Sequence, residues 1–196
     1  MSHIVAICGM MGSGKSTALR QLSSKHPDCC CLHEDDFNPA LLQSVDQVQA
    51  WWERGSPLAE IDLSDLAAEL QRAADSGSVN GVVLLETQFG RLHPALRPMI
   101  DLQCWIDVEP DLALARKVAQ LATQFAEAPD AATSLQPLFW LAEFCDIYAQ
   151  TTRKFFMKQR TEVTGQSDIV VTGDQSPADV CQQLEQALPG LFSNAA

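Results

Sequence analysis

Positive charge is scarce in this sequence. Its 196 residues include 13 Lys and Arg against 25 Asp and Glu, which gives a formal net charge of −12 at pH 7. Proteins that bind nucleic acid or anionic membranes need a basic face to meet the phosphate groups, and none is evident here. We therefore expect neither a nucleic acid nor a membrane surface among the partners.

Long apolar runs and spaced cysteine pairs are also missing. No run is long enough to cross a bilayer, and the N-terminal stretch MSHIVAICGMM lacks the basic region and cleavage site of a signal peptide. Of the seven cysteines, no two form a Cys-x-x-Cys pair. Three are consecutive at 29–31, where neighbouring strand side chains would point to opposite faces. We therefore expect free thiols and a cytoplasmic protein.

A glycine-rich stretch lies between a predicted strand and a predicted helix. Residues 9–17, GMMGSGKST, match the P-loop pattern Gly-x-x-x-x-Gly-Lys-Ser. Glycines let backbone N–H groups approach an anion closely, the lysine reaches the β- and γ-phosphates, and the serine hydroxyl can ligate Mg²⁺. The N-terminus of the following helix adds partial positive charge. The motif predicts that ATP is bound by Gly9, Gly12, Ser13, Gly14, Lys15, Ser16 and Thr17.

Short apolar segments alternate with helical patterns along the chain. Buried parallel strands are predicted at 3–8, 28–33, 81–86, 102–107 and 168–172. Helices are predicted at 15–24, 62–75, 110–126, 136–160 and 177–188, and the long segment 136–160 allows a break. This alternation predicts an α/β protein with the three-layer α/β/α P-loop NTPase fold and a five-stranded parallel sheet. We expect one domain over residues 1–190 and a frayed tail at 191–196.

Acidic residues follow several of the predicted strands. The segment HEDDF at 33–37 closes the second strand, and Glu86 and Asp107 end the third and fourth. Ligands of doubly wound sheets bind beyond the carboxyl ends of the strands, so these carboxylates are expected to face the phosphate loop. That arrangement suits Mg·ATP chemistry. We predict a functional role for Asp35 and Glu86, and a helix cap or solvated turn for Asp107.

Four segments of the sequence resemble the uridine kinase family of P-loop kinases, including its nicotinamide riboside kinase relatives. They cover most of the chain and lie at 9–17, 33–37, 82–117 and 148–177. The resemblance implies that Asp35, the first aspartate of DDF, is the base for the acceptor hydroxyl. It also implies that Glu86 belongs to the metal and substrate shell.

The sequence departs from that family at two places. Ser56 lies near the position where the family has an aspartate for the ribose hydroxyls. Residues 118–152 contain neither Arg nor Lys, whereas the lid of the family carries several arginines that clamp phosphates. Arg116, just before this gap, is therefore the arginine that we expect to stabilise the transferred charge.

Together these features predict an ATP- and Mg²⁺-dependent kinase that transfers the γ-phosphoryl group to a hydroxyl of a small-molecule acceptor. Catalytic roles are predicted for Lys15, Asp35 and Arg116. Mg²⁺ would be held, directly or through water, by Ser16, Asp35 and Glu86. The acceptor is expected to contact Asp35, Trp52, Glu86, Phe89 and Arg91, with Phe37 and Trp51 as further candidates.

The segment around the predicted acceptor site is acidic, with Glu34, Asp36, Asp46, Glu53, Glu60 and Asp62. An anionic acceptor would be repelled there, which favours a neutral or cationic one such as a nucleoside or nucleoside-like riboside. Two alternatives stay open: a P-loop kinase for a sugar acid such as glycerate, and a nucleotide-dependent ATPase or switch protein. Assembly into a homo-oligomer is also possible.

Overall fold

A parallel sheet forms the centre of the molecule. The computed structural model describes residues 2–37, 45–76, 81–127, 135–188 and 190. Five parallel strands lie in the order β2-β3-β1-β4-β5. Their bounds are β1 (His3–Gly9), β2 (Cys30–His33), β3 (Val82–Thr87), β4 (Leu102–Asp107) and β5 (Ile169–Thr172). All five predicted strands are confirmed, and the second begins two residues later than expected.

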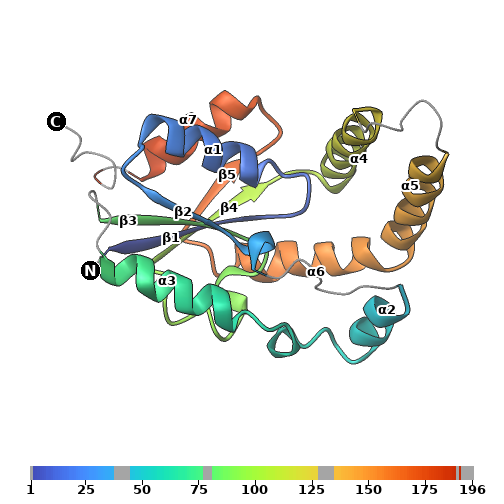
Figure 1. Cartoon of the computed structure of the whole chain (residues 1–196), viewed down its shortest axis with the longest axis horizontal. Coiled ribbons are helices and arrows are strands. Elements are labelled where there is room, and N and C mark those ends of the chain that lie inside the picture. Colours follow the sequence, from blue (N-terminus) through green and yellow to red (C-terminus); the bar gives the residue numbers. More distant parts are fainter. Residues whose placement is uncertain (1, 38–44, 77–80, 128–134, 189, 191–196) are drawn as a thin grey trace.

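Helices cover both faces of this sheet. On one face, α1 (Lys15–Lys25) packs against α7 (Pro177–Ala187), and α3 (Ser64–Ser76) and α6 (Arg153–Thr164) lie on the other (Figure 1). The three-layer α/β/α prediction is therefore confirmed. Because both faces are covered, strand β1 reads as a continuous apolar run, and residues 5–8 are fully buried.

Two helical features differ from the prediction. The segment expected at 136–160 is broken into α5 (Gln136–Ile147), a π-helical turn η4 (Tyr148–Thr152) and α6. A π-helical turn carries extra residues per turn, which changes the face that the next helix presents. Helix α2 (Val45–Glu53) was not predicted, whereas α4 (Pro110–Ala126) has the predicted bounds. The tail predicted at 191–196 lies outside the described residues.

The cysteines fit the sequence-based expectation. All seven cysteines are free thiols. Burial raises the pKa of Cys104 to about 12, so this core thiol stays protonated. Within the described ranges, no helix is long and apolar enough to span a membrane.

The glycine-rich loop between β1 and α1 needs its glycines for different reasons. A Cβ on Gly9 would overlap the Ser13 hydroxyl. Gly12 has φ 81°, and a Cβ there would overlap the backbone carbonyl of Ala113 in α4. Gly14 has φ 96°, but nothing lies within 4 Å of the place where its Cβ would be. Glycine at position 12 therefore lets the loop pass close to α4, because any side chain there would collide with the helix.

Gly12→Ala should destabilise the protein more than Gly14→Ala. Both changes force an alanine into the left-handed region, at a cost of about 1–2 kcal/mol. Gly12→Ala also drives a methyl group into the Ala113 carbonyl, so α4 must shift. Urea denaturation of the two variants measures the difference, and equal losses would mean that the packing of α4 on the loop contributes nothing.

Candidate active site

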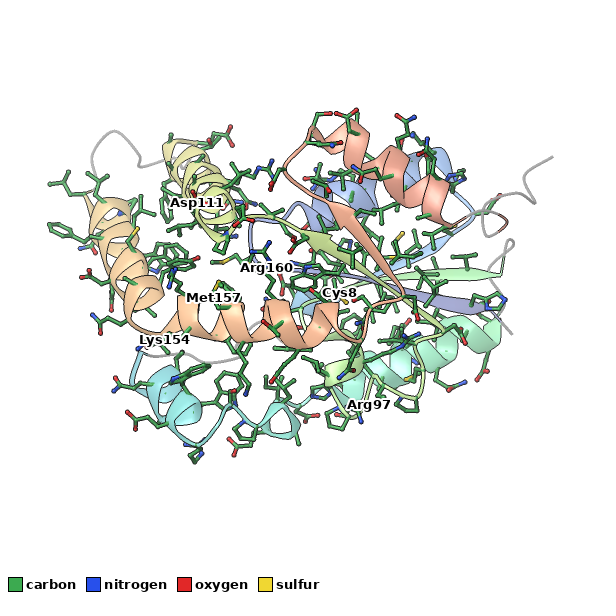
Figure 2. The ribbon with its side chains drawn as sticks, turned by 180° about the vertical axis from the view of Figure 1, so that it is seen from behind. Cys8, Arg97, Asp111, Lys154, Met157 and Arg160 are labelled. Atoms are coloured by element: carbon green, nitrogen blue, oxygen red, sulfur yellow. The ribbon has the colours of Figure 1, made fainter. Side chains whose placement is uncertain are left out.

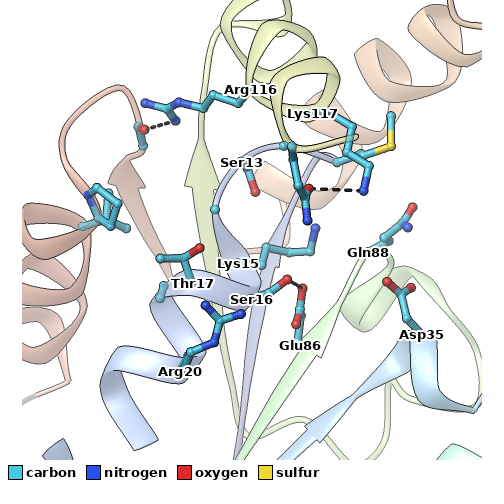
Figure 3. A pocket seen from close by; sticks show the side chains of 18 of the residues that line it. Ser13, Lys15, Ser16, Thr17, Arg20, Asp35, Glu86, Gln88, Arg116 and Lys117 are labelled. Carbon is cyan, nitrogen blue, oxygen red and sulfur yellow. Dashed lines mark hydrogen bonds between the residues drawn. The ribbon is translucent and has the colours of Figure 1, made fainter. Parts of the chain in front are cut away.

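A cleft of about 460 Å³ opens at the carboxyl edge of the sheet, above the glycine-rich loop (Figure 3). Its walls come from the loop and the first turns of α1, from the short helical turn after β2, from the end of β3, from the middle of α4, and from the segment after β5 with the start of α7. This volume lies in the range of about 300–1,000 Å³ typical of small-molecule sites. The cleft contains these predicted residues: Gly12, Ser13, Gly14, Lys15, Ser16, Thr17, Asp35, Glu86 and Arg116.

The floor of the cleft is suited to an anion. Lys15 is almost buried, and its Nζ donates a hydrogen bond to the Met10 carbonyl at 3.2 Å. The Ser13 hydroxyl is buried and has no hydrogen-bond partner among the described residues. Helix α1 begins at Lys15, so its positive N-terminus faces the same space. Gly9 lies beneath Ser13 and supports the loop from below, rather than lining the cleft.

Oxygen ligands lie beside this anion-binding floor. The Ser16 hydroxyl donates to Glu86 Oε1 at 2.6 Å, and Glu86 Oε2 is 2.5 Å from Nδ1 of His33. Asp35 lies exposed at the edge of the same cleft. Over the described part of the chain, no group of three or more His, Cys, Asp or Glu side chains forms a metal cage. Mg²⁺ usually binds one or two carboxylates together with substrate phosphates, so this ligand set fits it.

Glu34 has a different environment from its acidic neighbours. It is buried, and its carboxylate accepts hydrogen bonds from the Thr87 hydroxyl and, at 3.3 Å, from the Gln88 N–H. Burial raises the pKa of Glu34 to about 7. The prediction that it faces an acceptor is therefore wrong. Instead it joins the end of β3 to the short helix η1 (Glu34–Asp36), which carries Asp35.

The structure separates the residues predicted to contact the acceptor. Trp52 and Phe89 line a second pocket beside the cleft, and Gln88 lines both spaces. Arg91 lies elsewhere: its guanidinium donates to the Asp101 carbonyl at 2.7 Å and pairs with Asp168 at 2.8 Å. These two acids directly precede β4 and β5, at the sheet edge opposite the cleft. The prediction that Arg91 contacts the acceptor is therefore wrong.

No protein-family model and no curated protein matches the chain. Solved structures do resemble it. A gluconokinase from Sinorhizobium meliloti 1021 is 14% identical, with 98% of this chain and 94% of that chain covered and a TM-score of 0.52. A sugar kinase from Janibacter sp. HTCC2649 is also 14% identical, with 94% and 92% covered and a TM-score of 0.51. The chain shares the P-loop NTPase fold with these two kinases. Resemblance to the uridine kinase family in particular stays a prediction.

In this fold, α4 brings two basic side chains to the cleft, and they point in different directions (Figure 3). Arg116 donates to the Gly173 carbonyl at 2.7 Å and to the Gln175 carbonyl at 3.5 Å. It therefore holds the segment after β5, and the geometry does not support the charge-stabilising role predicted for it.

Lys117 takes the position over the phosphate loop. Figure 3 shows its side chain reaching down toward Lys15, and its Nζ donates to Gln120 Oε1 at 3.3 Å. Partial burial lowers the pKa of Lys117, while the nearby Asp35 and Glu86 carboxylates oppose that shift. We did not select Lys117 from the sequence. The sequence did hold a signal for this residue, because Lys117 is the last Lys or Arg before residues 118–152, which contain neither.

Asp107 is neither a helix cap nor a solvated turn. Its two carboxylate oxygens accept from Nε and Nη2 of Arg160, each at 2.7 Å, and Oδ1 also accepts from the Trp105 indole at 3.0 Å. Arg160 reaches from α6 toward the sheet (Figure 2). The hydrogen bonds from Arg160 lower the pKa of Asp107. This ion pair therefore ties the end of β4 to α6.

Asp107→Asn should destabilise the protein at pH 7 by about 1 kcal/mol, since the ion pair is partly exposed. A lowered pKa contributes stability that is present above the unfolded value and lost as the pH falls through the folded value. The difference between wild type and variant should therefore shrink as the pH drops below the ordinary value of 3.8. Denaturation curves from pH 7 to pH 3 measure it. A difference that stays constant over that range would contradict the role of the ion pair.

Proposed function

We propose that this protein is a kinase that uses Mg·ATP to phosphorylate a hydroxyl group of a small molecule. One observation carries the proposal: Lys15, Asp35 and the Ser16–Glu86 pair converge in a single cleft above the glycine-rich loop. A module that only binds nucleotide needs the loop and the lysine. It has no need of a free carboxylate placed across the cleft from them, which favours transfer over binding alone.

The donor half of the reaction would use the loop. Its backbone N–H groups and the N-terminus of α1 would hold the β- and γ-phosphates, and Lys15 would offset the charge that develops on the β,γ-bridging oxygen. Ser16 and Glu86, with Asp35 through water, would hold Mg²⁺, which supplies positive charge to the phosphate oxygens. The buried Ser13 hydroxyl would gain a partner when phosphate fills the loop.

The acceptor half would centre on Asp35. Its carboxylate accepts the hydroxyl proton while the acceptor oxygen forms its bond to the γ-phosphorus. The bond from that phosphorus to the bridging oxygen breaks, and ADP leaves with the electron pair. Lys117 stabilises the negative charge on the transferred group from the opposite side of the cleft. This step needs no covalent intermediate on the protein.

Within this function we propose a neutral nucleoside or nucleoside-like riboside as acceptor, as the motifs shared with the uridine kinase family suggest. The acidic residues around the predicted acceptor site do not support this choice of a neutral acceptor, because several of them are paired or buried. Glu60 pairs with Arg54 at 2.7 Å, Asp62 accepts from the Ser64 N–H at 3.0 Å, and Glu34 is buried. A sugar acid is the second candidate, because the fold is shared with a gluconokinase. Such an acceptor would need cations in its binding pocket.

Asp35→Asn should bind Mg·ATP normally and lose phosphoryl transfer by roughly 10²-fold or more, because the amide cannot accept the proton. Lys15→Ala should lose both binding and transfer. Calorimetry measures binding, and mass spectrometry of reactions with uridine, cytidine, nicotinamide riboside and glycerate detects the product. Wild-type transfer by Asp35→Asn would overturn the role of Asp35. Release of ADP without any phosphorylated acceptor would favour an ATPase or switch.

Lys117→Met should lower kcat by roughly tenfold to a hundredfold and leave the free energy of unfolding nearly unchanged, because its charge serves the transferred phosphoryl group. Arg116→Met should instead weaken nucleotide binding more than it lowers kcat, because Arg116 holds the segment after β5 that lines the cleft. Lys25→Met is the matched control, since Lys25 lies at the far end of α1 and pairs with Glu185. Steady-state kinetics with varied ATP separates these effects. An unchanged kcat for Lys117→Met would exclude the proposed role.

A further inference from the structure

The second pocket, of about 180 Å³, lies between α2, the loop after β3 and the start of α6. Half of the residues that line it are aromatic: Trp51, Trp52, Phe89, Phe155 and Phe156. The polar side chains that reach it are Gln88, Thr151 and Thr152. Among the described residues, none that lines it carries a charge. The pocket therefore differs in kind from the charged cleft next to it.

The walls of this pocket are held in place by ring contacts. Phe155 meets Trp51 edge to face with ring centroids 5.2 Å apart, and it meets Phe89 in the same way at 6.3 Å. The Trp51 indole N–H also donates to the Pro57 carbonyl at 3.2 Å. Trp51 and Phe89 are buried, whereas Trp52 is half-buried. The pocket is thus preformed, and Trp52 is the ring best placed to serve a ligand rather than the core.

Gln88 joins the pocket to the cleft. Its backbone is fixed on both sides, because its N–H donates to Glu34 and its carbonyl accepts from the Gln159 side chain. Its own side chain lines the cleft together with Asp35, and Figure 3 shows both side chains on the same side of the cleft. A molecule whose hydroxyl reaches Asp35 can therefore extend past Gln88 into the aromatic pocket.

We infer that this pocket holds an uncharged aromatic or heteroaromatic ring of the acceptor, remote from the reacting hydroxyl. The inference rests on the proposed kinase function and specifies its substrate class. The volume is below the roughly 300–1,000 Å³ of a whole-ligand site, so it fits one part of a ligand. The aromatic faces favour stacking, and the three polar side chains can bond to the ring edge. A carboxylate or phosphate here would lose its water without gaining a cation.

Isothermal titration calorimetry on the full chain, with Mg²⁺ and a non-hydrolysable ATP analogue, tests the inference. The probes are uridine and 2-phenylethanol, which carry rings, and gluconate and glycerol, which do not. At least one ring-bearing probe should bind, and both ring-free probes should bind more weakly than it does. Trp52→Ala should weaken that binding at least about tenfold through the lost stacking and burial, and leave the affinity for the ATP analogue unchanged.

Two further variants control the experiment. Trp140→Ala removes a tryptophan from α5, outside the pocket, and should change neither affinity. Thr152→Phe fills the pocket without removing core atoms and should abolish binding of the ring, with the affinity for the ATP analogue showing that the chain is folded. The inference is overturned if gluconate or glycerol binds most tightly, if neither ring binds, or if ring binding survives both pocket variants. Failure of the wild type to bind the ATP analogue would instead overturn the proposed function.

Discussion

The candidate site depends on one buried carboxylate. Glu34 accepts hydrogen bonds from Thr87 and Gln88, and so fastens the ends of two neighbouring parallel strands to each other. The short helix that carries Asp35 begins at Glu34, and Gln88 is the residue that the two pockets share. The same buried group therefore positions the proposed base and the boundary of the proposed acceptor pocket. Its burial also explains why the pKa of Glu34 is raised to about 7.

Few positively charged groups surround the site. Lys15, Lys117 and the N-terminus of α1 face the phosphate floor, while Arg116 is engaged with backbone carbonyls. The described residues of the neighbouring pocket are uncharged, and half of them are aromatic. Phosphate and the non-reacting part of an acceptor would therefore be recognised by different physical interactions on the two sides of Gln88. A protein of net charge −12 would then bind a polyphosphate through the local positive charge of Lys15 and Lys117, and not through its overall charge.

Structural features that depend on residues close together in the sequence could be predicted from the sequence. The five strands, the loop and the helix that starts at Lys15 follow from apolar runs and glycine spacing, which act over a few residues. The end of each strand then indicated that Asp35 and Glu86 would lie near Lys15, because parallel strands share a carboxyl edge. Helix α2 was missed, and its indole Trp51 packs on Phe155, more than a hundred positions away. That contact gives the helix a buried face which the local pattern does not reveal.

The sequence alone was sufficient for the sheet, the phosphate loop and the carboxylates that face it, because backbone geometry and short-range spacing dictate them. The direction of individual side chains depended on packing between distant segments. Arg91 turned to Asp168 at the opposite edge of the sheet, and Lys117 rather than Arg116 turned toward the loop. The aromatic pocket likewise required rings from α2, from the loop after β3 and from α6 to meet. Residues so far apart along the chain meet only when the helices pack on the sheet. A local sequence pattern does not indicate which side chains will be in contact after that packing.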